Sequence, residues 1–466
     1  MRNPGPAPRT PRNLRPERSF SGISGALAIL AGALLLPPPP GTAQDSAHGT
    51  RVRAWKEIRF AEVGAAFRIP ADFETRPALT RNAGQTAREY TGMLGGTQAL
   101  LRIRTDADHF QTVSRGLLEV AQEGRLLSVR GFRLDGEPGA RYRLLSEDHG
   151  LETLGVLLCP RRRLVHLALQ LPRNAGAAPL SESSRLLESL RILPAKEITL
   201  ARPMAELRDL SELRLGFPGR VRADIRELST AHYRLWTDAA PSGARKLLAF
   251  LEREFTPLIQ ERIGPFDRDL GHPDLTIFLH RTRNGYLLAA LRSGIPREQA
   301  EAMDGHAWDR FYSTWYAGPR DPIHIHEATH QVMAAVYGLD GGGPWLQEGI
   351  AQWVESRFSR LDPRRLARNL LRRSRAPDFD EMLRAKSFLH RNRRGLVGSK
   401  DLYELASSLL AFLREKRPEA FPDFLLETGI LPDTRKKLCE EAIEHSLGWD
   451  MDELEARWKA WALDRK

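Results

Sequence analysis

Residues 326–330 read His-Glu-Ala-Thr-His, and Glu348 follows eighteen positions after the second histidine, within Trp-Leu-Gln-Glu-Gly-Ile-Ala at 345–351. On a helix, positions i and i+4 share a face, so His326 and His330 can point two imidazoles at one ion. Glu327 is rotated away from that line but stays within reach of a metal-activated water. Two neutral nitrogen ligands, an open coordination position and a nearby carboxylate are what a zinc hydrolase needs.

The residues around the motif predict the helix that this geometry requires. Asp321 can serve as its N-cap, Pro322 suits the first helical position, and Gly338 is a natural C-terminal stop. An apolar stripe runs along the same segment and comprises Ile325, Val332, Met333 and Val336. A surface helix that carries two histidines by chance is the alternative, because a short motif alone is a weak indication.

Glu348 is the candidate for the third protein ligand. The three glycines at 341–343 form a flexible turn, and Pro344 starts a second helix with Glu348 one turn into it. A helix, a tight turn and a returning helix would bring Glu348 back against the histidines. The coincidence of a cap, a second helix and this glutamate favours a metal site over a chance motif.

These two segments resemble the gluzincin metallopeptidases, in particular the peptidase MA-like domains of bacterial envelope proteins. The resemblance is specific over residues 316–358 and diffuse over the rest of 205–466. It implies that His326, His330 and Glu348 hold one zinc ion (Zn2+), and that Glu327 is the general base.

Two further side chains have alternative roles. Tyr403 lies near the start of an apolar-striped helix expected over 401–413. In the aminopeptidases of the gluzincin group, a tyrosine that opens such a helix donates a hydrogen bond to the tetrahedral intermediate; the alternative is a tyrosine that packs with its hydroxyl at the rim. Glu355, seven residues after Glu348, either supports a ligand histidine or is a solvated helix glutamate, and the solvated alternative is favoured.

The segment at 310–318 is rich in β-forming residues and ends in Gly-Pro. In zinc peptidases of this type an edge strand beside the metal helix pairs with the substrate backbone, so the resemblance implies that role for this segment. The Gly-x-Met-Glu-Asn strand that fixes the free amine in the aminopeptidase branch is missing here. Endopeptidase action is therefore favoured over exopeptidase action.

Residues 1–43 look like a secretory signal peptide. Five arginines precede a 14-residue apolar core at 23–36, and Gly-Thr-Ala at 41–43 offers a cleavage site. An uncleaved anchor is the main alternative, although the apolar core is short for a bilayer. No other stretch suits a membrane helix, so no stable membrane insertion is expected after cleavage. We expect a periplasmic or extracellular protein.

Charge and cysteine content exclude some classes of protein. The formal net charge is +11, and the five arginines and one glutamate of residues 1–43 leave +7 on the remainder. The basic residues are spread out, with short runs such as 161–163, which favours solvated faces over a binding surface; nucleic-acid binding has no motif behind it. Cys159 and Cys439 cannot form a disulfide framework, and two buried thiols are favoured over one long-range bridge.

Residues 44–195 are expected to be an α+β domain, an antiparallel sheet with helices. Expected strands cover 58–69 as a pair, 97–105, 126–134, 140–146, 151–159, 164–171 and 191–193, and expected helices cover 109–123 and 182–190. The order is similar to that of the PsbP-like domains of exported bacterial proteins. The domain is either a docking module or a structural companion of the peptidase.

Residues 205–466 are expected to be a mostly α, zincin-like metallopeptidase domain with a small mixed sheet. Strands are expected at 231–237 and 275–280, with a helix at 243–259 capped by Ser242 between them, and helices from Pro322 onward. Four other histidines fall outside ligand spacing and are interpreted as core or surface residues: His280, His306, His324 and His390.

The sequence therefore predicts an exported zinc-dependent peptide hydrolase that acts on a peptide or protein substrate. One alternative is a catalytically silent, zinc-stabilised envelope protein for binding or assembly. Another is a hydrolase of a non-peptide amide, such as a cell-wall crosslink.

Overall fold

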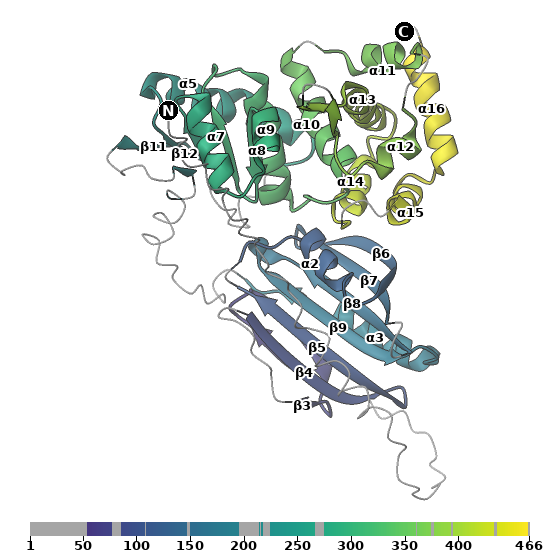
Figure 1. Cartoon of the computed structure of the whole chain (residues 1–466). Helices are drawn as coiled ribbons and strands as arrows, with labels where there is room; N and C mark the ends of the chain where they lie inside the picture. The colour runs from purple at the N-terminus through teal and green to yellow at the C-terminus, as the bar shows by residue number, and fades with distance from the viewer. Residues whose placement is uncertain are drawn as a thin grey trace, which may run out of the picture. The chain divides into compact units, whose positions relative to one another are not determined.

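The first half of the described chain is built on β-sheet, and the second half is mostly helical (Figure 1). The computed structural model describes residues 54–76, 85–107, 109–146, 150–194, 214, 216–217, 224–265, 275–359, 361–373, 377–392, 395–432 and 436–464. Residues from Arg53 onward belong to one compact unit. The predicted signal peptide and the predicted boundary near 196–204 lie outside the described residues, so both stay predictions.

The larger sheet has seven antiparallel strands in the order β3-β4-β5-β9-β8-β7-β6. A separate antiparallel sheet has the order β1-β2-β10. The strands are β1 (Trp55–Phe60), β2 (Ala65–Pro70), β3 (Glu74–Arg76), β4 (Gln85–Leu94), β5 (Thr97–Asp106), β6 (Arg125–Leu134), β7 (Glu137–Ser146), β8 (Leu151–Leu158), β9 (Leu164–Pro172) and β10 (Arg191–Ile192). The sheet-rich layout predicted for this half is confirmed, although β3 and β4 were not predicted.

Two helices accompany these sheets, α2 (Val113–Val120) and α3 (Ala177–Glu188). The predicted helix at 109–123 is shorter in the structure because Thr112 ends the preceding extended segment. The Thr112 side chain accepts a hydrogen bond from the Arg115 backbone N–H, which is how an N-cap residue starts a helix.

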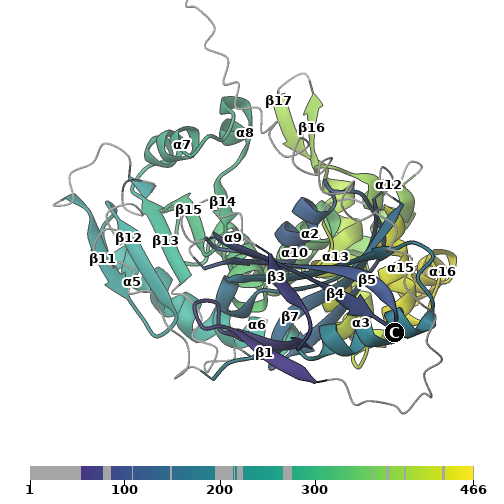
Figure 2. The same cartoon turned by 90° about the horizontal axis from the view of Figure 1, so that it is seen from below.

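The smaller sheet is mixed, with the order β11-β12-β13-β15-β14 (Figure 2). Its strands are β11 (Arg226–Ser229), β12 (Tyr233–Thr237), β13 (Leu275–His280), β14 (Gly305–Trp308) and β15 (Phe311–Trp315). Strands β12, β13 and β15 run parallel to one another, and β14 pairs antiparallel with β15. The strand predicted at 310–318 therefore lies inside the sheet, and β14 forms the edge. The prediction of an edge strand at 310–318 was wrong.

Helices form most of the remaining chain, as predicted. Helix α5 (Pro241–Phe250) starts at Pro241 with Ala240 as N-cap, so the predicted cap at Ser242 was wrong. The others are α6 (Thr256–Arg262), α7 (Arg283–Arg292), α8 (Arg297–Ala302), α9 (Pro322–Val332), α10 (Pro344–Ser359), α11 (Pro363–Leu371), α12 (Phe379–Arg384), α13 (Lys400–Lys416), α14 (Phe421–Gly429), α15 (Lys436–Leu447) and α16 (Met451–Leu463). Strands β16 (Leu389–Asn392) and β17 (Gly395–Gly398) form an unpredicted hairpin.

The packing of α10 against α13 positions the candidate site. Trp345, Leu346 and Ile350 of α10 are fully buried. Gly349 permits close approach, because a Cβ atom at this position would lie 3.0 Å from the Cβ atom of Ala406 on α13. The contact brings the first turns of both helices together, and these turns carry Glu348 and Tyr403.

The structure also bears on the two cysteines and on the presence of membrane-spanning helices. Cys159 and Cys439 are both buried and are not joined by a disulfide, as favoured from the sequence. Within the described ranges, no helix is both long enough and apolar enough to cross a bilayer.

Candidate metal centre

Helix α9 presents both histidines of the sequence motif on one face. The Asp321 side chain caps it by accepting a hydrogen bond from the Ile323 backbone N–H at 3.1 Å. The ring centroids of His326 and His330 lie 4.9 Å apart. A π-helical segment, η6 (Met333–Tyr337), continues the helix until Gly338 ends it with a left-handed backbone at φ 66°. The predicted helix, its cap and its stop are confirmed.

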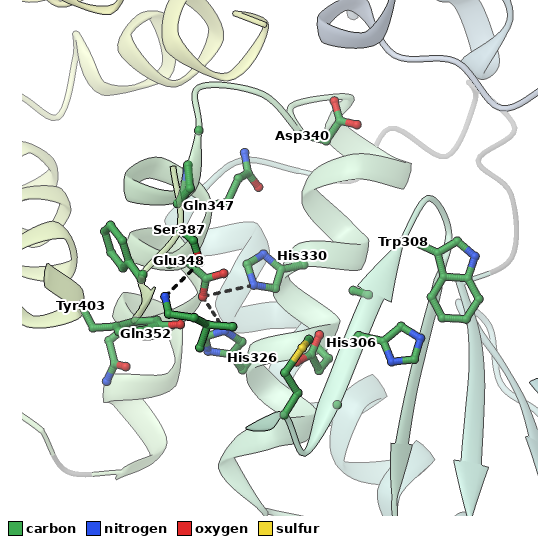
Figure 3. A pocket seen from close by; sticks show the side chains of 18 of the residues that line it. His306, Trp308, His326, His330, Asp340, Gln347, Glu348, Gln352, Ser387 and Tyr403 are labelled. Atoms are coloured by element: carbon green, nitrogen blue, oxygen red, sulfur yellow. Dashed lines mark hydrogen bonds and ion pairs between the residues drawn. The ribbon is translucent and has the colours of Figure 1, made fainter. Parts of the chain in front are cut away.

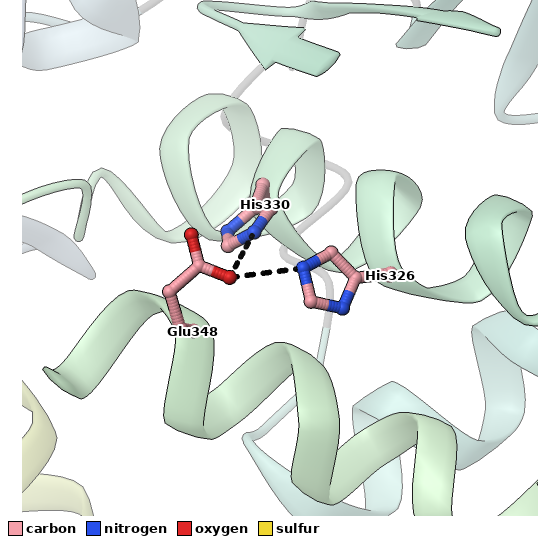
Figure 4. Close-up of side chains that lie close together, drawn as sticks. All are labelled: His326, His330 and Glu348. Carbon is pink, nitrogen blue, oxygen red and sulfur yellow. Dashed lines mark hydrogen bonds and ion pairs between the residues drawn. The ribbon is translucent and has the colours of Figure 1, made fainter. Parts of the chain in front are cut away.

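Helix α10 returns Glu348 to the two histidines (Figure 4). One carboxylate oxygen of Glu348 lies 3.1 Å from His326 Nε2 and 3.8 Å from His330 Nε2. The neighbouring Gln347 side chain fixes the turn between the helices by donating to the Leu339 carbonyl at 3.0 Å and to the Gly341 carbonyl at 2.7 Å. The predicted convergence of the three side chains is confirmed.

The donor set fits a zinc ion. Its three ligand atoms, one from each of His326, His330 and Glu348, all lie within 4.8 Å of one another. Ligand atoms about 2 Å from a tetrahedral zinc ion are about 3.3 Å apart, and the separations of 3.1 and 3.8 Å from the Glu348 oxygen to the two imidazoles are close to this value. Two imidazoles and one carboxylate leave a fourth position open, as in catalytic zinc sites.

Charge in the site favours a cation among these three side chains. Burial disfavours imidazolium at His326, but hydrogen bonds with Glu348 and Glu355 outweigh burial and raise the His326 pKa well above its usual value. Burial alone would raise the Glu348 pKa, yet hydrogen bonds with both histidines hold it well below the usual range. Positive charge beside Glu348 is therefore stabilised. A divalent metal would compete with the proton for this place, since metal binding requires neutral imidazole.

Glu355 contacts the first candidate ligand histidine from a position two turns beyond Glu348 on α10. Its Oε2 atom lies 3.4 Å from His326 Nδ1, and its side chain is only 15% exposed. The favoured prediction of a solvated glutamate was therefore wrong. A carboxylate at Nδ1 orients the ring so that Nε2 faces Glu348, which is how metal-binding histidines are commonly held. The seven-residue spacing from Glu348 indicated this position, and only the burial was missed.

Glu327 lies beside the three candidate ligands, with its side chain buried. Burial raises the pKa of its carboxyl, and the nearby His326 and His330 oppose that shift. The edge strand approaches it closely, because a Cβ atom at Gly305 would lie 2.8 Å from Glu327 Cγ. Only glycine leaves room for the strand at this point.

Tyr403 reaches the site from the first turn of α13. Its ring centroid is 6.4 Å from that of His326, and Glu348 is among the carboxylates that act on its hydroxyl. Burial and the neighbouring carboxylates raise the pKa of its hydroxyl, so the group stays a proton donor. The structure brings Tyr403 to the candidate ligands, while its catalytic role stays a prediction.

A cleft of about 1110 Å³ opens onto these side chains (Figure 3). Strand β14 lines one part of it, and residues near the start of α13 line another part. From the first half of the chain, α2 contributes Ser114, Arg115 and Leu118. The sequence did not predict β14, since four residues give too short a pattern. The turn after β14 could have been recognised from Asp309, because aspartate is common in turns. Asp309 has a φ of 53°, a left-handed backbone that aspartate tolerates.

The remaining histidines do not join the site. Among the residues that the structure describes, His326, His330 and Glu348 are the only group of three or more suited to holding a metal ion. His280 Nε2 pairs with the Ser313 hydroxyl, His306 Nδ1 pairs with the Tyr286 hydroxyl, and His324 is buried in the core. The side chain of His390 lies outside the described residues.

Comparison with known proteins gives no family assignment. No family model matches the chain, and no curated protein matches it. Among solved structures, the cyanobacterial PsbP protein (CyanoP) of Synechocystis sp. PCC 6803 is similar at 13% identity and a TM-score of 0.25, over 32% of this chain and 98% of that chain. A crystal structure from Bacteroides thetaiotaomicron VPI-5482 is similar at 8% identity and a TM-score of 0.20, over 65% of this chain and 78% of that chain. Likenesses this low assign no function, so the gluzincin-like and PsbP-like assignments stay predictions.

Proposed function

We propose that this chain is an exported zinc-dependent peptide hydrolase of the gluzincin type, with an endopeptidase mode of action and a PsbP-like N-terminal domain. One observation carries the proposal. The donor atoms of His326, His330 and Glu348 converge at a cleft that also holds the buried carboxyl of Glu327 and the open edge of strand β14. A metal hydrolase needs these parts together.

Zinc, when bound, supplies a Lewis acid for the scissile carbonyl and activates the attacking water. Glu327 is the base that takes the proton of this water and then delivers a proton to the leaving amine. Its burial suits the role of the base, because burial raises the pKa of the Glu327 carboxyl and makes its carboxylate a stronger proton acceptor.

Tyr403 is the proposed donor to the oxyanion. Its ring lies beside His326, and burial together with the nearby carboxylates raises the pKa of its hydroxyl, which keeps the proton on the oxygen. A fixed neutral donor in a site shielded from water stabilises charge that develops only in the transition state.

Strand β14 is the proposed docking edge for the substrate backbone. It is the last strand of the smaller sheet among the residues described, and it lines the cleft beside Glu327. An extended peptide added to this edge would form main-chain hydrogen bonds without demanding a particular side chain. This geometry favours peptides over non-peptide amides as substrates.

Export rests on residues 1–43, whose basic start, short apolar core and small-residue end are those of a secretory signal peptide. Cleavage of this leader would release the peptidase to the periplasm or the exterior.

The test is the isosteric substitution Glu327→Gln, with Glu261→Gln as a matched change at an exposed position outside the cleft. We expect Glu327→Gln to keep one equivalent of zinc and to lower the rate of casein cleavage by about 10² to 10⁴, the usual contribution of a general base. Glu261→Gln should cleave as the wild type does. Metal content by mass spectrometry and cleavage by gel assay measure the two properties separately.

Two outcomes would contradict the proposal. Normal cleavage by zinc-loaded Glu327→Gln would refute the assignment of the base. Zinc-loaded wild-type protein that leaves a diverse peptide library intact, with and without a chelator, would favour the catalytically silent binding protein instead.

A further inference from the structure

The turn between β8 and β9 adopts an unfavourable backbone. Arg161 and Arg162 both have positive φ angles, 51° and 63°, in the left-handed region that residues with a Cβ atom avoid. Two adjacent residues remain there only where the surroundings require it. The Arg162 side chain is only 3% exposed, although the basic run at 161–163 predicted a solvated turn.

The Arg162 guanidinium donates hydrogen bonds to two backbone carbonyls and forms an ion pair with one carboxylate. Its Nε atom donates to the Ala335 carbonyl at 3.0 Å, and its Nη2 atom donates to the Val336 carbonyl at 2.6 Å. Its Nη1 atom lies 3.3 Å from the buried carboxylate of Glu137, which also accepts a hydrogen bond from the Arg161 backbone N–H at 2.8 Å. The buried charge is therefore paired, and the paired carboxylate also holds the turn in place.

The two carbonyls belong to the segment that ends the metal-site helix. Ala335 and Val336 lie in η6, which continues α9 directly after His326 and His330. The last carbonyls of a helix lack backbone partners and carry partial negative charge, so a guanidinium there is favourable. Gly338 shows how closely the arginine fits, because a Cβ atom there would lie 2.6 Å from Arg162 Nη1.

A second contact holds the connection that follows. The Ser114 hydroxyl of α2 donates to Asp340 at 2.5 Å, and Arg115 lies 3.4 Å from the same carboxylate. Arg115 also forms an ion pair with Asp309, directly after strand β14. Asp340 lies between α9 and α10, so the sheet-rich half of the chain is attached to the turn that sets the spacing of the two ligand-bearing helices.

We propose that Arg162 is a positioning residue for the metal centre, which makes the N-terminal domain part of the support for zinc binding rather than a separate docking module. The guanidinium fixes where the helix of His326 and His330 ends, and the connection from there delivers Glu348. This inference rests on the zinc site of the proposed function, but it concerns metal affinity and geometry and not turnover.

The experiment compares Arg162→Met with Arg163→Met in the full-length protein. Arg163 is a matched control because its guanidinium donates to the Glu62 carbonyl at 2.6 Å, within the N-terminal half. Zinc affinity is measured by competition with a chromophoric chelator, and ligand geometry by the visible absorption of the cobalt(II)-substituted protein. We expect Arg162→Met to weaken zinc binding about tenfold and to shift the cobalt bands, as partners of metal ligands do. Arg163→Met should stay within about twofold of the wild type with an unchanged spectrum.

Equal zinc affinities and cobalt spectra for Arg162→Met and the wild type would overturn the inference, and so would equal losses in Arg162→Met and Arg163→Met. If Arg162→Met does not fold, Arg162→Lys decides: zinc affinity below that of the wild type together with shifted cobalt bands supports the inference, and wild-type affinity and bands overturn it. Failure of the proposed function is seen separately, because wild-type protein that binds no zinc would remove the site before any variant is compared.

Discussion

The two faces of strand β14 hold histidines in opposite chemical surroundings. On the face toward α9, Gly305 packs against Glu327, and His326 lies between the carboxylates of Glu348 and Glu355. On the other face, His306 stacks on Trp308 with ring centroids 4.8 Å apart, and its Nδ1 atom meets the Tyr286 hydroxyl at 3.2 Å. We call these the carboxylate face and the aromatic face.

The surroundings shift the pKa values of the two histidines in opposite directions. On the carboxylate face, hydrogen bonds with Glu348 and Glu355 overcome burial and raise the His326 pKa well above its usual value. On the aromatic face, burial lowers the His306 pKa to about 4, and its Nε2 atom has no hydrogen-bond partner among the described residues. Carboxylates within reach therefore make a buried histidine a candidate cation site, while burial without such carboxylates keeps it neutral.

The largest expected difference between the faces is in metal binding. His326→Ala removes one of the three proposed zinc ligands, so we expect the variant to lose the zinc ion. His306→Ala removes a buried ring from the aromatic face, so the zinc should stay although the fold is weakened. Metal content after gel filtration measures both. One retained equivalent of zinc in His326→Ala would contradict the ligand set.

The sequence predicted the carboxylate face better than the aromatic face. Helical spacing, an N-cap at Asp321 and a stop at Gly338 are local features of the sequence. They were enough to predict that His326, His330 and Glu348 lie close together. Strand β14 depends on pairing with β15 across a turn at Asp309, and no local pattern encodes which strand lies at an edge. The burial of Arg162 was equally unpredictable, because it depends on segments more than 170 residues apart.

The next largest expected effect is on kcat, in a comparison of matched substitutions at two tyrosines. Tyr403 lies on the carboxylate face beside Glu348, and Tyr286 lies on the aromatic face beside His306. Tyr403→Phe should lower kcat by about 10² to 10³ with little change in KM, as expected for a donor that acts in the transition state. Tyr286→Phe should leave kcat within about threefold. Equal losses in both variants would argue for a general packing effect.

Because of the buried His306 on the aromatic face, the free energy of unfolding should depend on pH. The pKa of His306 is about 4 in the folded state against an ordinary value of 6.5, so the unfolded state binds the proton more readily between these values. The contribution of a neutral His306 is therefore present above pH 6.5 and is lost as the pH falls toward 4. It amounts to at most about 3 kcal/mol.

His306→Gln removes this titration while keeping a polar side chain. Denaturant unfolding followed between pH 4 and 7 should show a flatter decline for the variant than for the wild type. Parallel curves would contradict the lowered pKa.

The smallest expected effect comes from Glu355, which contacts the proposed ligand His326 and is not itself one of the three proposed ligands. Glu355→Gln keeps the size of the side chain and a hydrogen-bond acceptor but removes the charge beside His326 Nδ1. We expect zinc affinity to fall by about tenfold, the lower end of what such partners contribute, with kcat of the loaded protein little changed. Glu355→Ala removes the acceptor as well and should cost more. If both variants bind zinc as the wild type does, the ring of His326 is held by packing within α9 and α10, and the contrast between the two faces depends on Glu348 alone.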